Sequence, residues 1–186
     1  DGRRIGVYPE TKHPSYFDQI GLPHEGALLS ALSRYGFDGA DDPVFIQSFE
    51  VGNLEALHRK TAIRLIQLVD ASGHPADRPD LSYADMMQPE GLAAVARYAS
   101  GIGPAKDMLL ARDVGGALAG STGLVVHPWT FRAENMFLPA NLRAGADPAT
   151  HGDLPAELAA FIAEGVDGLF ADYPGMAVAA RRKAAR

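Results

Sequence analysis

The sequence contains no cysteine, which excludes disulfide bonds and thiolate metal sites. It has no apolar run near the roughly 20 residues that span a bilayer, so no transmembrane segment is expected. Basic residues are outnumbered by acidic ones, 17 to 23, and this balance argues against a general nucleic-acid-binding protein. The Gly-x-Ser-x-Gly elbow, the Walker phosphate loop and the His-Glu-x-x-His zinc motif are also absent. These absences by themselves indicate no reaction.

The composition is that of a globular protein, because 47% of the 186 residues are apolar. A chain of this length buries roughly two-thirds of its unfolded surface in one domain. No linker, repeat or low-complexity segment divides it, so we predict a single domain over residues 1–186. The basic residues at 181–183 and 186 are predicted to end a helix, with an interaction tail as the alternative.

Short apolar runs alternate with helical patterns along the chain. The predicted strands cover residues 4–8, 43–46, 63–66, 101–104, 124–126 and 167–170. Helical patterns cover residues 28–36, 53–61, 89–99 and 155–162, and another begins at Met176. This alternation predicts an α/β fold with a parallel sheet. Periodicity alone does not distinguish a closed barrel from an open doubly wound sheet.

Polar side chains follow most of the predicted strands. They are Glu10 and Lys12, Gln47 and Ser48, Gln67, His127 and Asp172, and glycines 101 and 103 take this place in one strand. Because the carboxyl ends of parallel strands meet at one rim, these groups are expected to line a ligand site. The polar stretch at 70–88 is predicted to be a surface loop that could contribute to binding.

Glu10 and Lys12 are two residues apart, so in an extended strand they lie on the same face. A carboxylate can hold a hard cation such as Ca²⁺ or Mg²⁺, and an ammonium group can neutralise a phosphate oxygen. The alternative is an ordinary ion pair at a strand end, which adds little stability. Gln47 could bind substrate or, equally well, satisfy backbone groups.

Residues 127–132 place an imidazole, an indole and a guanidinium directly after one strand. Arg132 could bind phosphate in a bidentate manner, and Trp129 could cover a sugar-like face. The alternative for His127 is a buried histidine with satisfied hydrogen bonds, and for Trp129 a packing role. Gly101 and Gly103 match only half of a dinucleotide fingerprint, so that assignment is poor.

In chain order, five motifs resemble those of bacterial glycerophosphodiester phosphodiesterases, especially the periplasmic type. They occupy residues 6–12, 44–49, 98–104, 126–132 and 165–174, almost the whole chain. The resemblance implies an incomplete TIM (β/α)8 barrel of the phospholipase-C-like phosphodiesterase fold, with about six of eight β/α units. It also implies periplasmic or secreted localisation and hydrolysis of a small glycerophosphodiester to glycerol 3-phosphate and an alcohol, with Ca²⁺ or Mg²⁺ as cofactor.

The resemblance also implies roles for single residues. Glu10 matches the family's third-strand metal ligand, and Lys12 matches its phosphate-contacting lysine. Trp129 matches the aromatic residue on the glycerol side of the pocket. The substrate-binding residues that we predict are Gln47, His127, Trp129 and Arg132. In the family, one histidine is expected to activate the substrate's own glycerol hydroxyl while another protonates the leaving alcohol.

Two features depart from the family pattern. The His-Arg motif, the second catalytic histidine and two further acidic ligands are not found, and the chain begins at Asp1 without Met. We therefore expect a chain truncated at its start, which alone would not hydrolyse glycerophosphocholine and would be unstable or self-associating because sheet edges stay unpaired. The other departure is the glycine-rich stretch 109–123, where the family's helix is expected to be degraded. The alternative is a non-catalytic barrel remnant that binds glycerophosphodiesters or a protein partner.

Overall fold

The computed structural model describes residue 2 and residues 4–110 and 123–184. The chain forms two compact units, one of residues 1–103 with 122–124 and the other of residues 104–121 with 125–186. The glycine-rich stretch that departs from the family pattern lies largely outside the described residues. No helix in the described ranges is long and apolar enough to cross a membrane.

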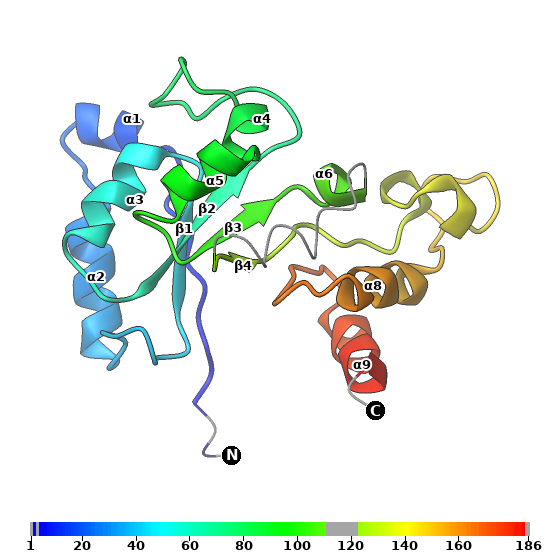
Figure 1. Ribbon diagram of the computed structural model, residues 1–186. Helices are drawn as coiled ribbons and strands as arrows, with labels where there is room; N and C mark the ends of the chain where they lie inside the picture. Colours follow the sequence, from blue (N-terminus) through cyan, green and yellow to red (C-terminus); the bar gives the residue numbers. More distant parts are fainter. Residues whose placement is uncertain (1, 3, 111–122, 185–186) are drawn as a thin grey trace. The chain divides into compact units, whose positions relative to one another are not determined.

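The first unit is built on parallel strands. Strands β1 (Phe45–Ser48), β2 (Arg64–Val69) and β3 (Gly101–Pro104) lie in the order β1-β2-β3, and β1 pairs with β2 in parallel from Phe45↔Arg64 to Ser48↔Gln67 (Figure 1). Parallel bridges also join Val7 to Val44 and Glu10 to Gln47, so the chain before β1 adds another extended segment. The predicted α/β fold with a parallel sheet is confirmed.

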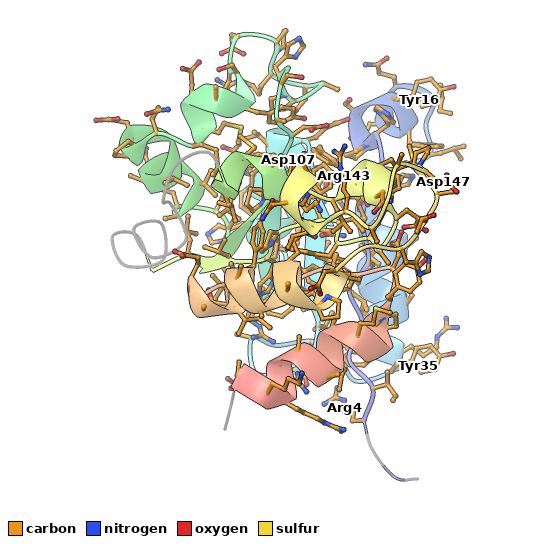
Figure 2. The ribbon with its side chains drawn as sticks, turned by 90° about the vertical axis from the view of Figure 1, so that its right-hand side faces the viewer. Arg4, Tyr16, Tyr35, Asp107, Arg143 and Asp147 are labelled. Carbon is orange, nitrogen blue, oxygen red and sulfur yellow. The ribbon has the colours of Figure 1, made fainter. Side chains whose placement is uncertain are left out.

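Helix α3 (Val51–His58) follows β1 and packs against both β1 and β2. Its apolar side chains Leu54 and Leu57 are fully buried, as are Ile46 of β1 and Ile66 of β2. The other helices of this unit are α1 (Pro14–Gln19), α2 (Glu25–Arg34), α4 (Tyr83–Met86) and α5 (Pro89–Val95). Tyr35, directly after α2, projects into solvent (Figure 2).

The stretch predicted as a loop at 70–88 contains helix α4, which the sequence analysis missed. Ser82 caps this helix, since its hydroxyl oxygen accepts a hydrogen bond from the Asp85 backbone N–H at 3.0 Å. Asp77, earlier in the same stretch, accepts hydrogen bonds from the backbone N–H groups of Val51 and Gly52 at 3.2 and 2.6 Å. The loop is therefore fastened to the N-terminus of α3.

The second unit contains strand β4 (Val125–Val126) and the helices α6 (Lys106–Leu110), α8 (Leu154–Ala163) and α9 (Pro174–Ala184). The last two pack on each other (Figure 1). Two turns of 3-10 helix, η1 (Asn135–Phe137) and η2 (Ala140–Leu142), lie in an otherwise irregular segment.

That irregular segment is held by side-chain bonds to its backbone. The Asn135 amide donates to the carbonyls of Ala144 and Asp147 at 2.9 and 2.8 Å. Arg143 donates from Nε to the Leu138 carbonyl at 2.8 Å, and Figure 2 labels Arg143 and Asp147 in this segment. Buried polar groups are thus paired without regular secondary structure.

The strand predicted at 167–170 is wrong. The structure has no strand at these positions, and an isolated parallel bridge joins Phe131 to Ala171, the residue that follows them. The reason lies in Asp167, whose carboxylate accepts the Val126 backbone N–H at 2.9 Å. The Asp167 and Gly168 N–H groups both point to the Val126 carbonyl, at 3.1 and 3.4 Å. These bonds replace the regular ladder that a strand would need.

Candidate functional site

The Glu10 carboxylate and the Lys12 ammonium group lie 3.4 Å apart, at the end of the extended segment that pairs with β1. The side chain of Lys12 is 76% exposed and that of Glu10 only 20%. The intervening Thr11 faces the interior, where its hydroxyl contacts the Asn53 side-chain oxygen at 2.7 Å. The alternation of these side chains confirms that Glu10 and Lys12 share a face.

A pocket of about 280 Å³ opens beside this pair. Its lining comes from the ends of the extended segment, of β1 and of β2, and from the loop and helix α4 that follow β2. It comprises Glu10, Thr11, Lys12, His13, Ser48, Phe49, Glu50, Asp70, His74, Ala76 and Tyr83. The carboxyl ends of these parallel segments therefore meet at one rim, as ligand sites in α/β proteins do. Burial raises the pKa of Tyr83 to about 12, so this phenol stays neutral at physiological pH.

Glu50 is a member of this pocket that the sequence analysis missed. It is only 3% exposed, and its Oε2 accepts a hydrogen bond from the Ser15 backbone N–H at 2.9 Å. Its Oε1 is buried and has no hydrogen-bond partner among the described residues. An unpaired buried carboxylate oxygen is costly in an isolated protein, so a bound group at this position would be stabilising. The available signal was its spacing, since Glu50 stands two residues after the strand-end Ser48.

The two strand-end amides differ in what they contact. Gln47 pairs through its backbone with Glu10, and its side-chain oxygen is buried without a partner among the described residues. Gln67 is fully buried and donates to the Phe49 carbonyl at 3.0 Å, while its oxygen accepts from the Tyr98 hydroxyl at 2.9 Å. Gln67 therefore satisfies groups of the fold, whereas Gln47 keeps an acceptor beside the acid of the pocket.

In the second unit, His127 and Trp129 follow β4. His127 is 7% exposed, and its ring lies against Gly168, where an added Cβ would meet its Cδ2 at 2.8 Å. Trp129 is partly exposed, and its backbone pairs in parallel with Ala105. This pairing fixes the direction in which the chain presents the indole. His127 thus packs in the interior of this unit, while Trp129 reaches its surface.

Arg132 is engaged by neighbours in the same unit. Its Nε donates to the Asp172 carboxylate at 2.8 Å, and its guanidinium lies 4.6 Å from the centroid of the Phe137 ring. Nearby along the chain, the Tyr173 hydroxyl contacts Glu134 and His151, each at 2.9 Å. The hydrogen bond to Glu134 raises the pKa of Tyr173. These contacts hold the planar guanidinium group of Arg132 in place at the surface.

The donor set for a metal ion is incomplete in the described ranges. No three carboxylate or imidazole side chains there gather closely enough to hold a cation. Glu10 fits as one ligand of such a site, because its carboxylate is partly exposed and lines the pocket. The neighbouring Lys12 ammonium group, however, is a competitor for that carboxylate.

Comparison with known proteins shows the family to which this chain is similar. Residues 4–176 match the model of the glycerophosphoryl diester phosphodiesterase family. The chain is 31% identical over 193 residues to glycerophosphodiester phosphodiesterase GDPD6 of Arabidopsis thaliana, covering 93% of this chain and 50% of that protein. It is 28% identical over 129 residues to a glycerophosphodiester phosphodiesterase of Haemophilus influenzae, covering 60% of this chain and 35% of that protein.

Solved structures show the same fold. A putative glycerophosphoryl diester phosphodiesterase from Silicibacter pomeroyi superposes with a TM-score of 0.65 at 20% identity, over 96% of this chain and 51% of that one. A glycerophosphodiester phosphodiesterase from Parabacteroides distasonis gives a TM-score of 0.61 at 14% identity, over 98% and 59%. This chain thus spans about half the length of the plant relative and of the Silicibacter structure, whose TIM-barrel fold it resembles. By its sequence and its fold, the chain belongs to the glycerophosphoryl diester phosphodiesterase family.

Proposed function

We propose that this chain supplies the phosphate-binding side of an active site that hydrolyses glycerophosphodiesters to glycerol 3-phosphate and an alcohol. The observation that carries the proposal is the Glu10–Lys12 pair, 3.4 Å apart in a pocket at the strand ends. An exposed ion pair adds only about 0–1 kcal/mol to stability, so folding alone gives little reason for this pair. Family membership supports the same reading.

In the proposed site, Lys12 donates to a phosphoryl oxygen and stabilises the negative charge that builds there. Its exposed ammonium group can reach a substrate without leaving the neighbourhood of Glu10. Glu10 is the proposed ligand for Ca²⁺ or Mg²⁺, which when bound neutralises charge on the phosphoryl group. The remaining ligands of that ion are proposed to come from outside the described residues.

Three of the other predicted residues are proposed to bind substrate directly, and His127 to support them. Gln47 offers a buried amide oxygen that lacks a partner among the described residues. Trp129 offers a partly exposed ring for the glycerol face. Arg132 presents an anchored guanidinium for an anionic group, and His127 supports the segment from which Trp129 projects.

The acid and base of the reaction are proposed to lie outside this chain. Phosphodiester cleavage needs a base for the attacking hydroxyl and an acid for the leaving alcohol. The chain spans half of its plant relative, and its histidines do not stand in the family's catalytic motifs. We therefore propose that this chain forms about six of the eight β/α units of a barrel. The complete active site is proposed to form only in a longer protein. That protein is proposed to be periplasmic or secreted.

The test compares the 186-residue chain with the product of the whole reading frame that contains it. Release of glycerol 3-phosphate from glycerophosphocholine is measured with Ca²⁺, with Mg²⁺ and with chelator. We expect turnover only by the longer product and only with a divalent ion. Turnover by the short chain at a similar rate would overturn the assignment of the acid and base.

Substitution of Lys12 tests the site itself. Lys12→Ala should lower kcat/KM of the longer protein by at least about 100-fold, because a charge-assisted contact to the reacting phosphate is lost. Its unfolding free energy should change by less than about 0.5 kcal/mol, since Lys12 is 76% exposed. Lys60→Ala, at an exposed position outside the pocket lining, is the matched control. Equal activity of the two variants would contradict the proposed role.

A second candidate is a non-catalytic barrel remnant that binds glycerophosphodiesters or a protein partner. This candidate is supported by the metal donor set, which is incomplete among the described residues. In that case the whole reading frame would add no His-Arg motif, and its product would bind glycerophosphocholine without hydrolysing it. Calorimetry for binding, together with release of glycerol 3-phosphate for hydrolysis, separates the two candidates.

A further inference from the structure

A second pocket, of about 380 Å³, lies in the first unit between α3, α5 and the loop that precedes α4. It is lined by Val51, Glu55, His58, Arg59, Arg78, Leu81, Met86, Gly91, Ala94, Val95, Arg97 and Tyr98. None of these residues lines the pocket of Glu10 and Lys12. The space is therefore separate from the proposed catalytic rim.

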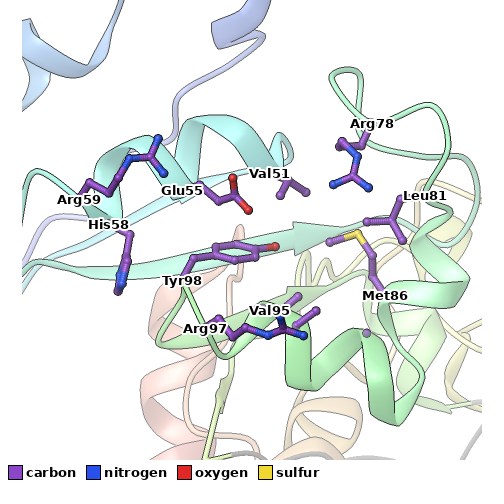
Figure 3. A pocket seen from close by; sticks show the side chains of 12 residues that line it. Val51, Glu55, His58, Arg59, Arg78, Leu81, Met86, Val95, Arg97 and Tyr98 are labelled. Atoms are coloured by element: carbon purple, nitrogen blue, oxygen red, sulfur yellow. The ribbon is translucent and has the colours of Figure 1, made fainter.

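The charge of this lining is opposite to that of the whole chain. The protein carries a net charge of −6, whereas the pocket has the three guanidinium groups of Arg59, Arg78 and Arg97 against the single carboxylate of Glu55. In Figure 3, Arg59 stands at the end of α3, Arg97 at the end of α5 and Arg78 on the loop, so cations approach the space from different sides. His58 adds an imidazole to the same wall.

Two of these cations are uncommitted. Among the described residues, neither Arg59 nor Arg97 has a carboxylate within ion-pair distance. Arg78 is different, because its Nε and one terminal nitrogen donate to Asp80 at 2.9 and 2.8 Å. Arg59 and Arg97 are thus the groups able to accept an anion, and guanidinium groups bind carboxylate or phosphate in a bidentate manner.

The floor of the pocket is apolar. Val51, Met86, Val95 and Tyr98 are each at most 8% exposed, so the space ends on packed side chains. The Tyr98 hydroxyl is already bonded to the Gln67 oxygen at 2.9 Å. Figure 3 shows the Tyr98 ring lying across the middle of the site, where it forms part of the apolar floor.

From this arrangement we propose that the pocket binds a small anionic amphiphile, with a phosphate or carboxylate head and a short alkyl body. The head is bound by one of the two uncommitted guanidinium groups of the lining, Arg59 or Arg97, and the alkyl body lies in the space above the apolar floor. Neither part of the site suffices alone: exposed arginines bind free anions weakly because water competes, and an apolar floor does not select for charge. The ligand is recognised by having both parts in one molecule.

The test is calorimetric titration of the product of the whole reading frame that contains this chain, with three probes below their micellar concentrations. Octyl phosphate has both parts, octyl glucoside has only the alkyl body, and inorganic phosphate has only the charge. We expect octyl phosphate to bind at least tenfold more tightly than either of the others. Equal affinity for octyl glucoside, equal affinity for inorganic phosphate, or no binding of octyl phosphate would each overturn the proposal.

Variants place the binding in the pocket. The double variant Arg59→Ala/Arg97→Ala should weaken octyl phosphate binding at least tenfold. The control Arg34→Ala/Lys60→Ala removes two exposed cations from outside the lining and should change the affinity less than twofold. Ala94→Trp should abolish binding by filling the space while the circular dichroism spectrum stays unchanged. Unaltered binding in the first and third variants would contradict the location.

A last arm separates a free amphiphile from a lipid surface, since both present a phosphate beside alkyl chains. Phosphatidylcholine vesicles that contain phosphatidate are sedimented with the chain. The proposal expects the protein to stay in the supernatant, because the ligand enters as a single molecule. Cosedimentation that is lost in the Arg59→Ala/Arg97→Ala variant, without binding of monomeric octyl phosphate, would overturn it in favour of a membrane contact.

Discussion

The Lys106 ammonium group lies 2.6 Å from the Glu157 carboxylate, inside the second unit, where their side chains are only 7% and 2% exposed. Lys106 also donates from Nζ to the Phe137 carbonyl at 2.7 Å and from its backbone N–H to the Trp129 carbonyl at 2.8 Å. One residue thus joins the start of α6 to α8, to η1 and to the segment that presents the indole. The sequence analysis did not identify this pair.

Loss of one partner of this pair should be strongly destabilising. Glu157→Ala leaves the ammonium group of Lys106 buried without its carboxylate, and we expect the unfolding free energy to fall by about 3–5 kcal/mol. Urea denaturation followed by circular dichroism measures the change. The double variant Lys106→Met/Glu157→Met is the control, and it should recover most of the loss because no charge is left unpaired. A cost below about 1 kcal/mol for Glu157→Ala would show that water reaches the site.

Asp77 should fasten the loop that carries part of the rim pocket. Its carboxylate accepts from the Val51 and Gly52 N–H groups at the start of α3, so Asp77→Ala removes a helix cap and should cost about 0.5–2 kcal/mol. Hydrogen exchange should show faster exchange of those two amides. Asp41→Ala, at an exposed position, should leave both the stability and the exchange unchanged. Unchanged protection in Asp77→Ala would mean that the cap is dispensable.

The position of the His127 ring should require glycine at residue 168, because the ring leaves no room for a Cβ there. An added Cβ would meet His127 Cδ2 at 2.8 Å and Nε2 at 3.0 Å, so Gly168→Ala should push the ring and cost about 1–3 kcal/mol. In Gly175→Ala the Cβ meets nothing within 4 Å, and that helical variant should be neutral or stabilised by up to about 1 kcal/mol. Thermal melts of the two variants provide the comparison. Equal melting temperatures would contradict the tight contact.

Asp80 should titrate at unusually low pH. The hydrogen bonds from Arg78 are the main cause, and they lower the pKa of Asp80 to about 2. Because the pKa is lower in the folded chain than the usual value of about 3.9, the Arg78–Asp80 pair contributes stability above pH 4 and loses it as the pH falls towards 2. A carboxyl-carbon NMR titration measures this pKa. In Arg78→Ala it should rise towards the usual value, and an unchanged value would exclude the arginine as the cause.

Local patterns predicted most of the first unit. The runs at 43–46 and 63–66 became β1 and β2, with bounds that differ from the predicted ones by one to three residues, since buried apolar runs need a sheet whatever surrounds them. Pro89 begins α5 as expected, because proline suits the first turn of a helix. The strand predicted at 167–170 failed for a different reason. The carboxylate of Asp167, within that run itself, accepts the N–H of Val126 in place of a ladder hydrogen bond.

In the candidate site, too, local spacing predicted some features and distant contacts decided others. The spacing of Glu10 and Lys12 was sufficient to place both groups on one face of an extended segment. Spacing puts Glu50 two residues after the strand-end Ser48 but could not show its burial, which depends on Ser15 of another element. It could not pair Lys106 with Glu157, because the two stand 51 residues apart in the chain.

The amino-acid sequence by itself determined the parallel α/β architecture, the face shared by Glu10 and Lys12, and the motifs of the family, since each depends on neighbours a few residues apart. Tertiary structure alone decided which polar groups are buried and paired: Gln67 with Tyr98, Lys106 with Glu157, and Glu50 with one oxygen lacking a partner among the described residues. The reason is that burial and hydrogen-bond partners depend on chain segments brought together by packing, and the order of residues along the chain does not specify those contacts locally.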